Sequence, residues 1–571
     1  MSNSRPQDAS QQRPAIRARS GLLVVVATAA LLSLVAVACG SSSKTTGAAA
    51  SASSTVPTKA VAGGSLVVGI PTESPGWNPA TDEWDDTGNL VGSTVLEPLA
   101  TPGADAGAKP WLATSWIANT DFTRWVVNLR KGVQFSDGTP FNADAVVKNF
   151  DAYLQSPFYT LTLGPIFKGV KALNESSVEV DFKQSFAAFP SSYLDSASTY
   201  MMAPAMLASK DKGASHPIGT GPFVFSSWEP NNSFKVNRNP HYWGGVDPSG
   251  KVMTGTPYLD SIEFRVITDE GTRSAALQSG DIDMLTTIQA STANSLAGQF
   301  NEVKDWDGNS VFVQFNTLAK VNGQANPFAD IHARRAVAYA TDAKAVADQA
   351  GKGLNLATSP FGPNTPWGMP SDQNGYLTYD LNKAKAEVAA YEKDTGASSL
   401  TFTLIGLPDI TTARTLQQLT AQWAKAGITA HIQTLAQTAR ISAIVSGSFE
   451  AQYGNNYGYP DPDNQYYFWT SAGIVNGGAV RINFSSYTTP QMDKDMNTGR
   501  ESGYPNVRRA AYDDVVRQLN AGLTHDWLYY TPFTYVSQKK VEGFNDSQGP
   551  GHVPFGNFMP KTWWSLVWLD K

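Results

Sequence analysis

One apolar run near the N-terminus limits how this chain can fold. Residues 21–38 are apolar apart from Thr28 and Ser33, and four arginines precede them. A basic start, an apolar core and small residues at its end are typical of a secretory signal peptide. The run is also about long enough to cross a bilayer as a helix, so an uncleaved anchor is the alternative. No later stretch is long and apolar enough to span a membrane, so we expect a globular body to follow.

Cys39 is the only cysteine of the chain and directly follows this run. The sequence "VAVAC" resembles the lipobox of bacterial lipoproteins, although Ala36 stands where leucine is usual. The resemblance implies that 1–39 is a signal peptide and that the Cys39 sulfur carries a lipid. The alternative is a small buried hydrophobe inside a spanning helix. Residues 40–63 are mainly Ser, Thr, Ala and Gly, which predicts a flexible tether.

The composition after the tether indicates a folded protein with more than one core. The whole chain is 42% hydrophobic and 16% charged, with a formal net charge of −6. The roughly 507 residues that remain are too many for one hydrophobic core, so two or three lobes are expected. No cluster of Lys and Arg marks a nucleic-acid surface. The lack of further cysteines fits an oxidising exterior.

Catalytic and cofactor motifs are absent from the sequence. Gly219-Thr220-Gly221 lacks the third glycine of a dinucleotide-binding loop, and no Walker A loop or G-x-S-x-G elbow occurs. The six histidines are scattered, without the spacing of a zinc site. These observations argue against an enzyme, a metal site and a bound cofactor. A secreted hydrolase with a spatially assembled site stays the less favoured alternative.

Local patterns predict a mixed α/β protein. "GGSLVVGIP" reads as a buried strand. Asn142 precedes apolar residues at helical spacing and predicts a helix over 143–153. Gly280 is expected to close a helix before the strand "DIDML". The stretch from "SLTFTLIGLP" to "TAHIQTLA" predicts a strand–helix–strand unit.

Five segments in order resemble the bacterial extracellular solute-binding proteins of the peptide/nickel-binding family, the receptors of ABC importers. The segments are "LRKGVQFSDGTPFNADAVVKNF", "PIGTGPFVFSSWEPNNSFKVNRNPHYWGG", "AALQSGDIDML", "VQFNTL" with "PFADIHARRAVAYATD", and "YPDPDNQYYFW". The resemblance covers nearly all of 64–571. It implies an α/β, two-lobed periplasmic-binding-protein-like fold of the large peptide-binding class, with an inserted subdomain and two crossing segments.

The resemblance also implies domain bounds. The first lobe is expected to hold 64–96, 203–312 and 526–571, with an inserted subdomain at 97–202. The second lobe is expected at 313–525, and "VFVQFN" and "LYYTPFTYV" are expected to cross between the lobes. A ligand that touches both lobes favours the closed form, which is the form a transporter senses.

The sequence departs from the family's dipeptide and nickel receptors at their diagnostic positions. Gly458 stands where dipeptide receptors have an aspartate for the ligand's ammonium group, and "LPDITT" supplies no arginine for its carboxylate. No histidine lies near Tyr457 to hold nickel. We therefore expect a neutral oligopeptide or an oligosaccharide rather than a dipeptide or nickel.

Aromatic and amide side chains near the expected cleft are the predicted ligand contacts, because aromatic rings pack on sugars and peptide side chains while amides both donate and accept. For Trp84 a core position is the equal alternative, and for Asp461 a turn cap is favoured over a ligand contact. The predicted contacts are Trp84, Asn316, Asn455, Asn456, Tyr457 and Asp461.

The sequence thus predicts a lipid-anchored receptor on the outer face of the cell membrane, or on the periplasmic side in a two-membrane cell. It would capture an oligopeptide or similar organic solute and deliver it to an ABC permease with its ATPase. We expect a monomer that binds no nucleic acid and no cofactor. The alternatives are an oligosaccharide receptor of the same family and a receptor for a signalling peptide.

Overall fold

Two very long strands organise the computed structural model of this protein. The structure describes residues 60–82, 84–103, 105, 107–196, 199–246, 251–363, 365–456, 461–474, 481–543 and 564–570. All of them belong to one compact unit, Thr58–Lys571. Cys39, the predicted signal peptide and most of the tether lie outside the described residues.

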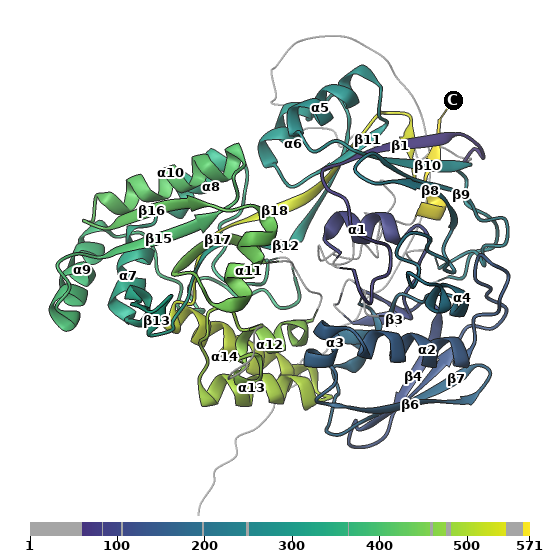
Figure 1. Ribbon diagram of the computed structural model, residues 1–571, viewed down its shortest axis with the longest axis horizontal. Coiled ribbons are helices and arrows are strands. Elements are labelled where there is room, and N and C mark those ends of the chain that lie inside the picture. The colour runs from purple at the N-terminus through teal and green to yellow at the C-terminus, as the bar shows by residue number, and fades with distance from the viewer. Residues whose placement is uncertain are drawn as a thin grey trace, which may run out of the picture. The chain divides into compact units, whose positions relative to one another are not determined.

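Within the described residues, ten strands form one mixed sheet (Figure 1). Its order from one edge to the other is β16 (Thr429–Thr434), β15 (Thr401–Gly406), β17 (Ala451–Asn456), β12 (Asn301–Phe315), β18 (His525–Ser537), β11 (Met284–Thr287), β1 (Ser65–Ile70), β10 (Ser261–Val266), β9 (Ser233–Arg238) and β8 (Phe223–Glu229).

The centre of this sheet is the antiparallel pair β12 and β18. Every residue of β18 is buried, and aromatic and apolar side chains make up more than half of its sequence. On one side β12 pairs with β17, and on the other β18 pairs with β11. The two predicted crossing segments therefore lie in neighbouring strands that run through both parts of the sheet. The predicted two-lobed α/β fold is confirmed.

A second, four-stranded antiparallel sheet lies within 113–182. Its order is β4 (Ala113–Ala118), β5 (Arg124–Leu129), β7 (Ser177–Phe182) and β6 (Phe167–Asn174). Three two-stranded ladders complete the strands: β2 (Ala100–Pro102) with β3 (Ala108–Pro110), β13 (Lys320–Val321) with β14 (Gln324–Ala325), and β19 (Val541–Glu542) with β20 (Trp568–Leu569).

Helices cover and connect the strands. They are α1 (Asp86–Gly92), α2 (Ala143–Leu154), α3 (Pro157–Thr162), α4 (Pro204–Ala208), α5 (Glu270–Ser279), α6 (Ala290–Leu296), α7 (Ile331–Ala340), α8 (Ala343–Ala350), α9 (Leu381–Thr395), α10 (Ile410–Ala424), α11 (Gln437–Ser446), α12 (Tyr466–Trp469), α13 (Pro490–Glu501) and α14 (Pro505–Gly522). Short helical turns are η1 (Pro190–Leu194), η3 (Pro327–Ala329), η4 (Pro462–Gln465), η5 (Ser471–Gly473) and η7 (Trp564–Leu566). None of the described helices combines the length and the apolar character that crossing a membrane requires.

Several local predictions are confirmed. The Asn142 side chain accepts the Ala145 N–H and caps α2. Gly280 ends α5 with φ +83°, a left-handed conformation that suits glycine. β15, α10 and β16 form the predicted strand–helix–strand unit with parallel strands.

Two large hydrophobic cores define the two lobes. In the first lobe, β1, β9 and β10 share one core with the four-stranded sheet and α2. In the second lobe, β15 and β17 pack with helices α7 to α10. A further core joins α12, α13 and α14, which follow β17 in the chain.

The strand directions decide where a ligand can lie. β1 pairs in parallel with both β10 and β11, so these three strands end at the same edge of the sheet. β15 likewise pairs in parallel with β17. The loops after such strand ends are the usual place for ligands in α/β sheets.

Candidate functional site

A cavity of about 1140 Å³ lies at these strand ends. The first lobe contributes 71–73, 85–87 and 268–270, which follow β1 and β10, and 286–289, where β11 ends. The second lobe contributes 407, 409–411 and 455–456, which follow β15 or end β17. Ligand pockets typically measure about 300–1,000 Å³, so this cavity admits a solute larger than a single amino acid or sugar.

The first-lobe wall of the cavity is acidic. The Asp85 carboxylate accepts the Gly88 N–H at 2.8 Å and caps α1, and Thr72 donates to it at 2.6 Å. Asp269 caps α5 through the Thr272 N–H at 2.7 Å, and this bond holds the pKa of Asp269 below its usual range. Both side chains are fixed by neutral donors at the start of a helix.

Glu73 and Glu270 extend this acidic wall. Glu73 accepts the Trp228 indole N–H at 2.7 Å and the Asn231 backbone N–H at 2.6 Å. Glu270 forms an ion pair with Arg273, whose side chain is 1% exposed. Burial lowers the pKa of Arg273, although the guanidinium also donates to the Ile267 carbonyl. Of the two glutamates, Glu270 is the one with a cation beside it.

The floor of the cavity is aromatic and comes from the two crossing strands. His525 stacks on Trp527 with ring centroids 4.6 Å apart, and Phe312 meets both rings edge-on. Burial lowers the pKa of His525 to about 3, so the imidazole is neutral at pH 7. Its Nε2 lies 3.1 Å from the amide nitrogen of Gln314. The floor therefore offers apolar surface and neutral polar groups.

The second-lobe wall is rich in amides. Arg440 donates to the Gln452 side chain at 2.8 Å, and Gln452 in turn donates to the Gln314 side chain. Asn455 donates to Asn309 at 2.9 Å. Apolar side chains complete the wall: Leu407, Ile410, Ile441, Ile444, Phe468 and Trp469.

Two of the predicted contacts, Asn455 and Asn456, line this cavity. Both end β17, which brings them to the edge where β15 also ends. The side-chain oxygen Oδ1 of Asn456 accepts a hydrogen bond from the Gln465 side chain at 3.2 Å, so the Asn456 side chain is held in place. Tyr457, the third predicted contact of this stretch, lies outside the described residues.

The structure places Trp84 in the packing of the first lobe and not among the residues that line the cavity. Its indole N–H donates to the Gly76 carbonyl at 2.9 Å, and its ring lies against Trp77 and Tyr200. A Cβ added at Gly92 would come 2.3 Å from this ring, so the glycine makes room for it.

Asn316 and Asp461 are also placed in the interior. Asn316 is fully buried and donates to the carbonyls of Gly447 and Phe449. The Asp461 side chain accepts a hydrogen bond from the Asp463 backbone N–H in the same turn, at 2.9 Å. It also accepts two hydrogen bonds from the Arg508 guanidinium, both at 2.7 Å. The alternative foreseen for Asp461, a turn cap, is the role that the structure gives it.

The acidic residues of the first-lobe wall were not predicted as ligand contacts. The sequence shows carboxylates around Trp84, but Asp269 and Glu270 read simply as the start of a helix. Strand order joins the two groups across more than 180 residues of chain, since β1 lies beside β10. The available signal was an aspartate directly before a helix that follows a strand, repeated at Asp85, Asp269 and Asp409.

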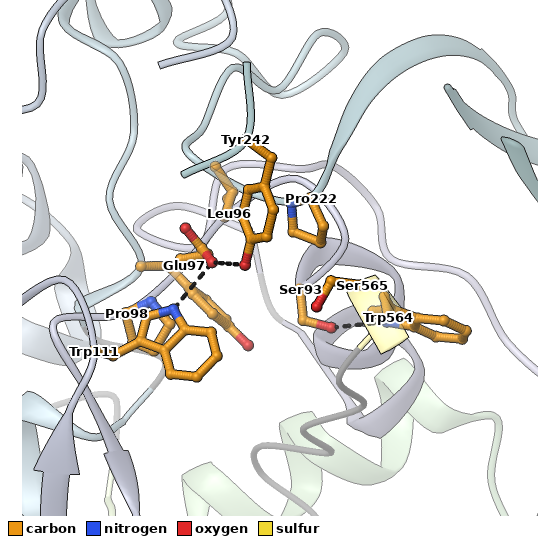
Figure 2. Close-up of a pocket in the computed structure, with 10 residues that line it drawn as sticks. Ser93, Leu96, Glu97, Pro98, Trp111, Pro222, Tyr242, Trp564 and Ser565 are labelled. Atoms are coloured by element: carbon orange, nitrogen blue, oxygen red, sulfur yellow. Dashed lines mark hydrogen bonds between the residues drawn. The ribbon is translucent and has the colours of Figure 1, made fainter. Parts of the chain in front are cut away.

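A separate small cavity of about 30 Å³ lies beside Glu97, where the first lobe meets the insertion expected at 97–202 (Figure 2). Glu97 is 3% exposed and accepts four neutral hydrogen bonds, from Trp111, Thr220, Tyr242 and Trp243, at 2.7–3.0 Å. Burial raises the pKa of Glu97. A volume of this size holds about one water molecule, so this cavity is part of the packing of the lobe.

The described residues contain no group of three or more His, Cys, Asp or Glu side chains placed to hold a metal ion. The chemistry that the large cavity offers is therefore hydrogen bonding, aromatic contact and negative charge.

Comparison with known proteins agrees with this architecture. A nickel-binding periplasmic protein of Escherichia coli (strain K12) is 26% identical over 469 residues, which cover 79% of this chain and 85% of the relative. The glutathione-binding protein GsiB of Salmonella choleraesuis (strain SC-B67) is 26% identical over 80% of this chain and 87% of its own. Both relatives are named as binding proteins.

The fold has close counterparts among solved structures. The oligopeptide-binding protein AppA of Bacillus subtilis, in complex with a nonapeptide, superposes with a TM-score of 0.72 at 22% identity and covers 90% of this chain and 100% of its own. Residues 107–477 match the family described as bacterial extracellular solute-binding proteins, family 5 Middle. Because this match takes in more than half of the sequence, the chain belongs to the family 5 bacterial extracellular solute-binding proteins.

Proposed function

We propose that this protein is the receptor of an ABC importer and that it captures an oligopeptide or a similar organic solute in the large cavity. The observation that carries the proposal is the cavity itself, about 1140 Å³ in volume and lined by strand ends of both lobes. A similar protein, AppA of Bacillus subtilis, has been solved with a nonapeptide. Amide side chains and an aromatic floor suit a chain of peptide groups and apolar side chains.

Capture proceeds by closure of the two lobes. The lobes are those expected from the sequence, with 64–96, 203–312 and 526–571 in the first, 313–525 in the second and 97–202 as the insertion. Asn455 in the second lobe and Asp85 in the first line the same cavity, so a solute that touches both side chains contacts both lobes. Such a solute favours the closed form by its extra contacts there. The permease and its ATPase then receive the solute from the closed receptor.

A lipid on Cys39 holds the receptor at the outer face of the membrane, with 40–63 as the tether. The test is Cys39→Ala in the full chain. We expect the variant to bind its solute as the parent does but to leave the membrane fraction. A variant that stays in that fraction with 1–39 still attached would instead support a spanning helix.

Binding is tested by thermal unfolding of the purified chain with peptides of two to nine residues, and with oligosaccharides of similar size. A solute at a hundredfold excess over its Kd stabilises the protein by about 2.7 kcal/mol. Asn456→Ala should weaken binding about two- to tenfold through one lost hydrogen bond. Asn382→Ala, on the exposed surface of α9, is the matched control and should bind as the parent does. Cleavage of the peptides, or the absence of any stabilisation, would overturn the proposed function.

A further inference from the structure

The charge of the large cavity is strongly unbalanced. Its lining includes six carboxylates and two guanidinium groups, and His525 beside them is neutral. Four negative charges are therefore left over. Five of the six carboxylates lie on the first-lobe wall: Glu73, Asp85, Asp86, Asp269 and Glu270.

Most of this negative charge is not neutralised by the protein. Glu73, Asp85 and Asp269 accept hydrogen bonds from backbone N–H groups, an indole and hydroxyls. Within the described part of the chain, none of these three carboxylates forms an ion pair, whereas Glu270 has Arg273 beside it. Uncompensated like charges in a cleft create a field that attracts the opposite charge.

The helix starts at the cavity add to this effect. α1, α5 and α10 all begin at its wall, and their N-terminal N–H groups would ordinarily favour an anion. Each helix instead begins with an aspartate cap, Asp85, Asp269 or Asp409. A full negative charge exceeds the roughly +0.5 charge of a helix N-terminus, so these helix starts repel anionic ligands.

A buried hydroxyl points independently to a missing hydrogen-bond partner. Thr286 lies in β11, is fully buried and lines the cavity. Its hydroxyl has no hydrogen-bond partner among the described residues. A buried polar group without a partner destabilises a protein by about 1–3 kcal/mol, and a polar group of a ligand in the cavity would supply the partner.

Apolar side chains accompany the acidic wall. Ile288 in the first lobe is 41% exposed and Ile410 in the second is 69% exposed, and both line the cavity. Large apolar side chains exposed next to carboxylates suit a ligand with an alkyl stem and a positive head, as in lysine and arginine.

We propose that the cavity selects an organic cation, a solute with alkylammonium or guanidinium groups such as a basic oligopeptide. Its positive group lies against Glu73, Asp85 and Asp269, and its alkyl stem lies between Ile288 and Ile410. The proposal rests on the proposed function as a solute receptor. It changes the expectation from the sequence, which was a neutral solute.

The test uses the full chain and calorimetric titration with four probes: the tetrapeptides Ala-Lys-Ala-Lys, Ala-Ala-Ala-Ala and Ala-Glu-Ala-Glu with free ends, and spermidine. We expect the lysine peptide to bind at least about tenfold more tightly than the alanine peptide, and the glutamate peptide to bind most weakly. The preference should shrink as NaCl rises from 50 to 500 mM, because salt screens exposed charges.

The double variant Asp85→Asn with Asp269→Asn removes two charges but keeps both helix caps, because asparagine caps a helix about as well as aspartate. We expect its affinity for the lysine peptide to fall about tenfold and that for the alanine peptide to change less than twofold. Asp380→Asn removes the charge of the same kind of cap at α9, away from the cavity, and should change neither affinity.

The outcomes separate the two proposals. Equal binding of the three peptides, or tightest binding of the glutamate peptide, would overturn the cation selectivity and leave the receptor function intact. Binding of spermidine without any peptide would support the cation selectivity and overturn the peptide part of the proposed function. If none of the four probes binds, the cation selectivity is overturned, and the receptor function is then decided by the thermal-unfolding test with peptides and oligosaccharides.

Discussion

Two sets of carboxylates in the molecule are held differently. Glu97 is buried among two indoles, a phenol and a hydroxyl, and Glu73 and Asp85 at the cavity also accept neutral donors. In the second lobe, Asp463 faces Arg500 at 2.7 Å and Asp461 faces Arg508 at 2.7 Å. The carboxylates of Asp461 and Asp463 are almost fully buried.

The second-lobe pairs also join the second lobe to the insertion expected at 97–202. Ser191 of η1 donates to Asp461 at 2.6 Å, and Asn464 donates to the Ser192 carbonyl. The Arg500 guanidinium lies 3.4 Å from the centre of the Tyr466 ring, and its ion pair with Asp463 raises the pKa of Arg500. The carboxylates of Asp461 and Asp463 are therefore neutralised by arginines inside the protein.

Comparing the two sets of carboxylates shows which negative charges are available to a ligand. A carboxylate paired with arginine contributes little field outside its pair, whereas one held by neutral donors keeps its charge. Glu73, Asp85 and Asp269 of the acidic wall are of the second kind. Stability and ligand selection are therefore assigned to different sets of acidic residues, and this division can be tested with substitutions of both kinds.

The largest expected effect is that of Arg500→Met. It leaves Asp463 buried without a cation, and breaking a buried pair in this way destabilises a protein by about 3–5 kcal/mol. Denaturant unfolding measures the loss. The double variant Arg500→Met with Asp463→Asn should recover part of it because no charge is left unpaired. Equal losses in the single and double variants would show that packing, and not charge, holds this region.

Glu97→Gln should have a smaller effect. In the parent, a carboxylate oxygen accepts these donors, whereas in the variant the glutamine NH₂ group faces some of them. One buried donor left without an acceptor lowers the free energy of unfolding by about 1–3 kcal/mol. Glu229→Gln, at an exposed position on β8, is the control and should leave stability nearly unchanged. If Glu97→Gln were as damaging as Arg500→Met, the contrast between neutral and ionic partners would not hold.

Asp526 gives an intermediate case, a buried acid in β18 that keeps its proton. Burial raises the pKa of Asp526 to about 8, and a hydrogen bond with Thr341 offsets this only in part. The unfolded chain releases this proton near pH 4 and the folded chain near pH 8, so the folded state holds the extra proton between them. Its contribution to stability is full below pH 4 and is lost as the pH rises to 8.

Asp526→Asn tests this dependence. The variant lacks the titrating group, so its stability should fall less between pH 4 and pH 8 than that of the parent. Unfolding curves at one-unit pH intervals measure the two slopes. Identical slopes would assign the pH dependence to other groups, of which Glu97 is the first to examine because burial raises its pKa as well.

The smallest expected effect on stability is that of Asp85→Asn. Asparagine keeps the cap of α1, so the free energy of unfolding should change by no more than about 0.5 kcal/mol. Asp461→Asn, which removes a charge facing Arg508, should by contrast be strongly destabilising. A large loss for Asp85→Asn would mean that the acidic wall stabilises the fold rather than serving a ligand.

Much of the fold could be predicted because its signals are local. The cap at Asn142, the left-handed glycine at 280 and the apolar run of β18 each follow from neighbouring residues. Asn455 and Asn456 were predicted from their place beside the "YPDPDN" segment of the family resemblance, and in the structure both lie at the end of β17. The two lobes and the crossing segments came from the family resemblance and not from these patterns, and the order of the strands in the sheet was not predicted.

The acidic wall could not be predicted, because it depends on which strand ends become neighbours. An aspartate before a helix has the same local pattern at Asp269 as at Asp380, although only Asp269 lines the cavity. Trp84 shows the converse limit. Its exposed-looking acidic neighbours suggested a surface ring, but α1 begins directly after it and the ring packs against Trp77 and Tyr200.

The central position of β18 has a consequence for the order in which the sheet forms. This strand ends at residue 537, yet it lies between β12 and β11, so the ten-stranded sheet is two separate pieces until β18 is made. At a synthesis rate of about 5–20 residues per second, about 20–90 s pass between the synthesis of β1 and that of β18. During that time the edges of β11 and β12 lack their partner, and unpaired edges invite aggregation. The chain therefore reaches its final fold only after nearly all of it has been made, and a helper that shields these edges meanwhile would raise its yield.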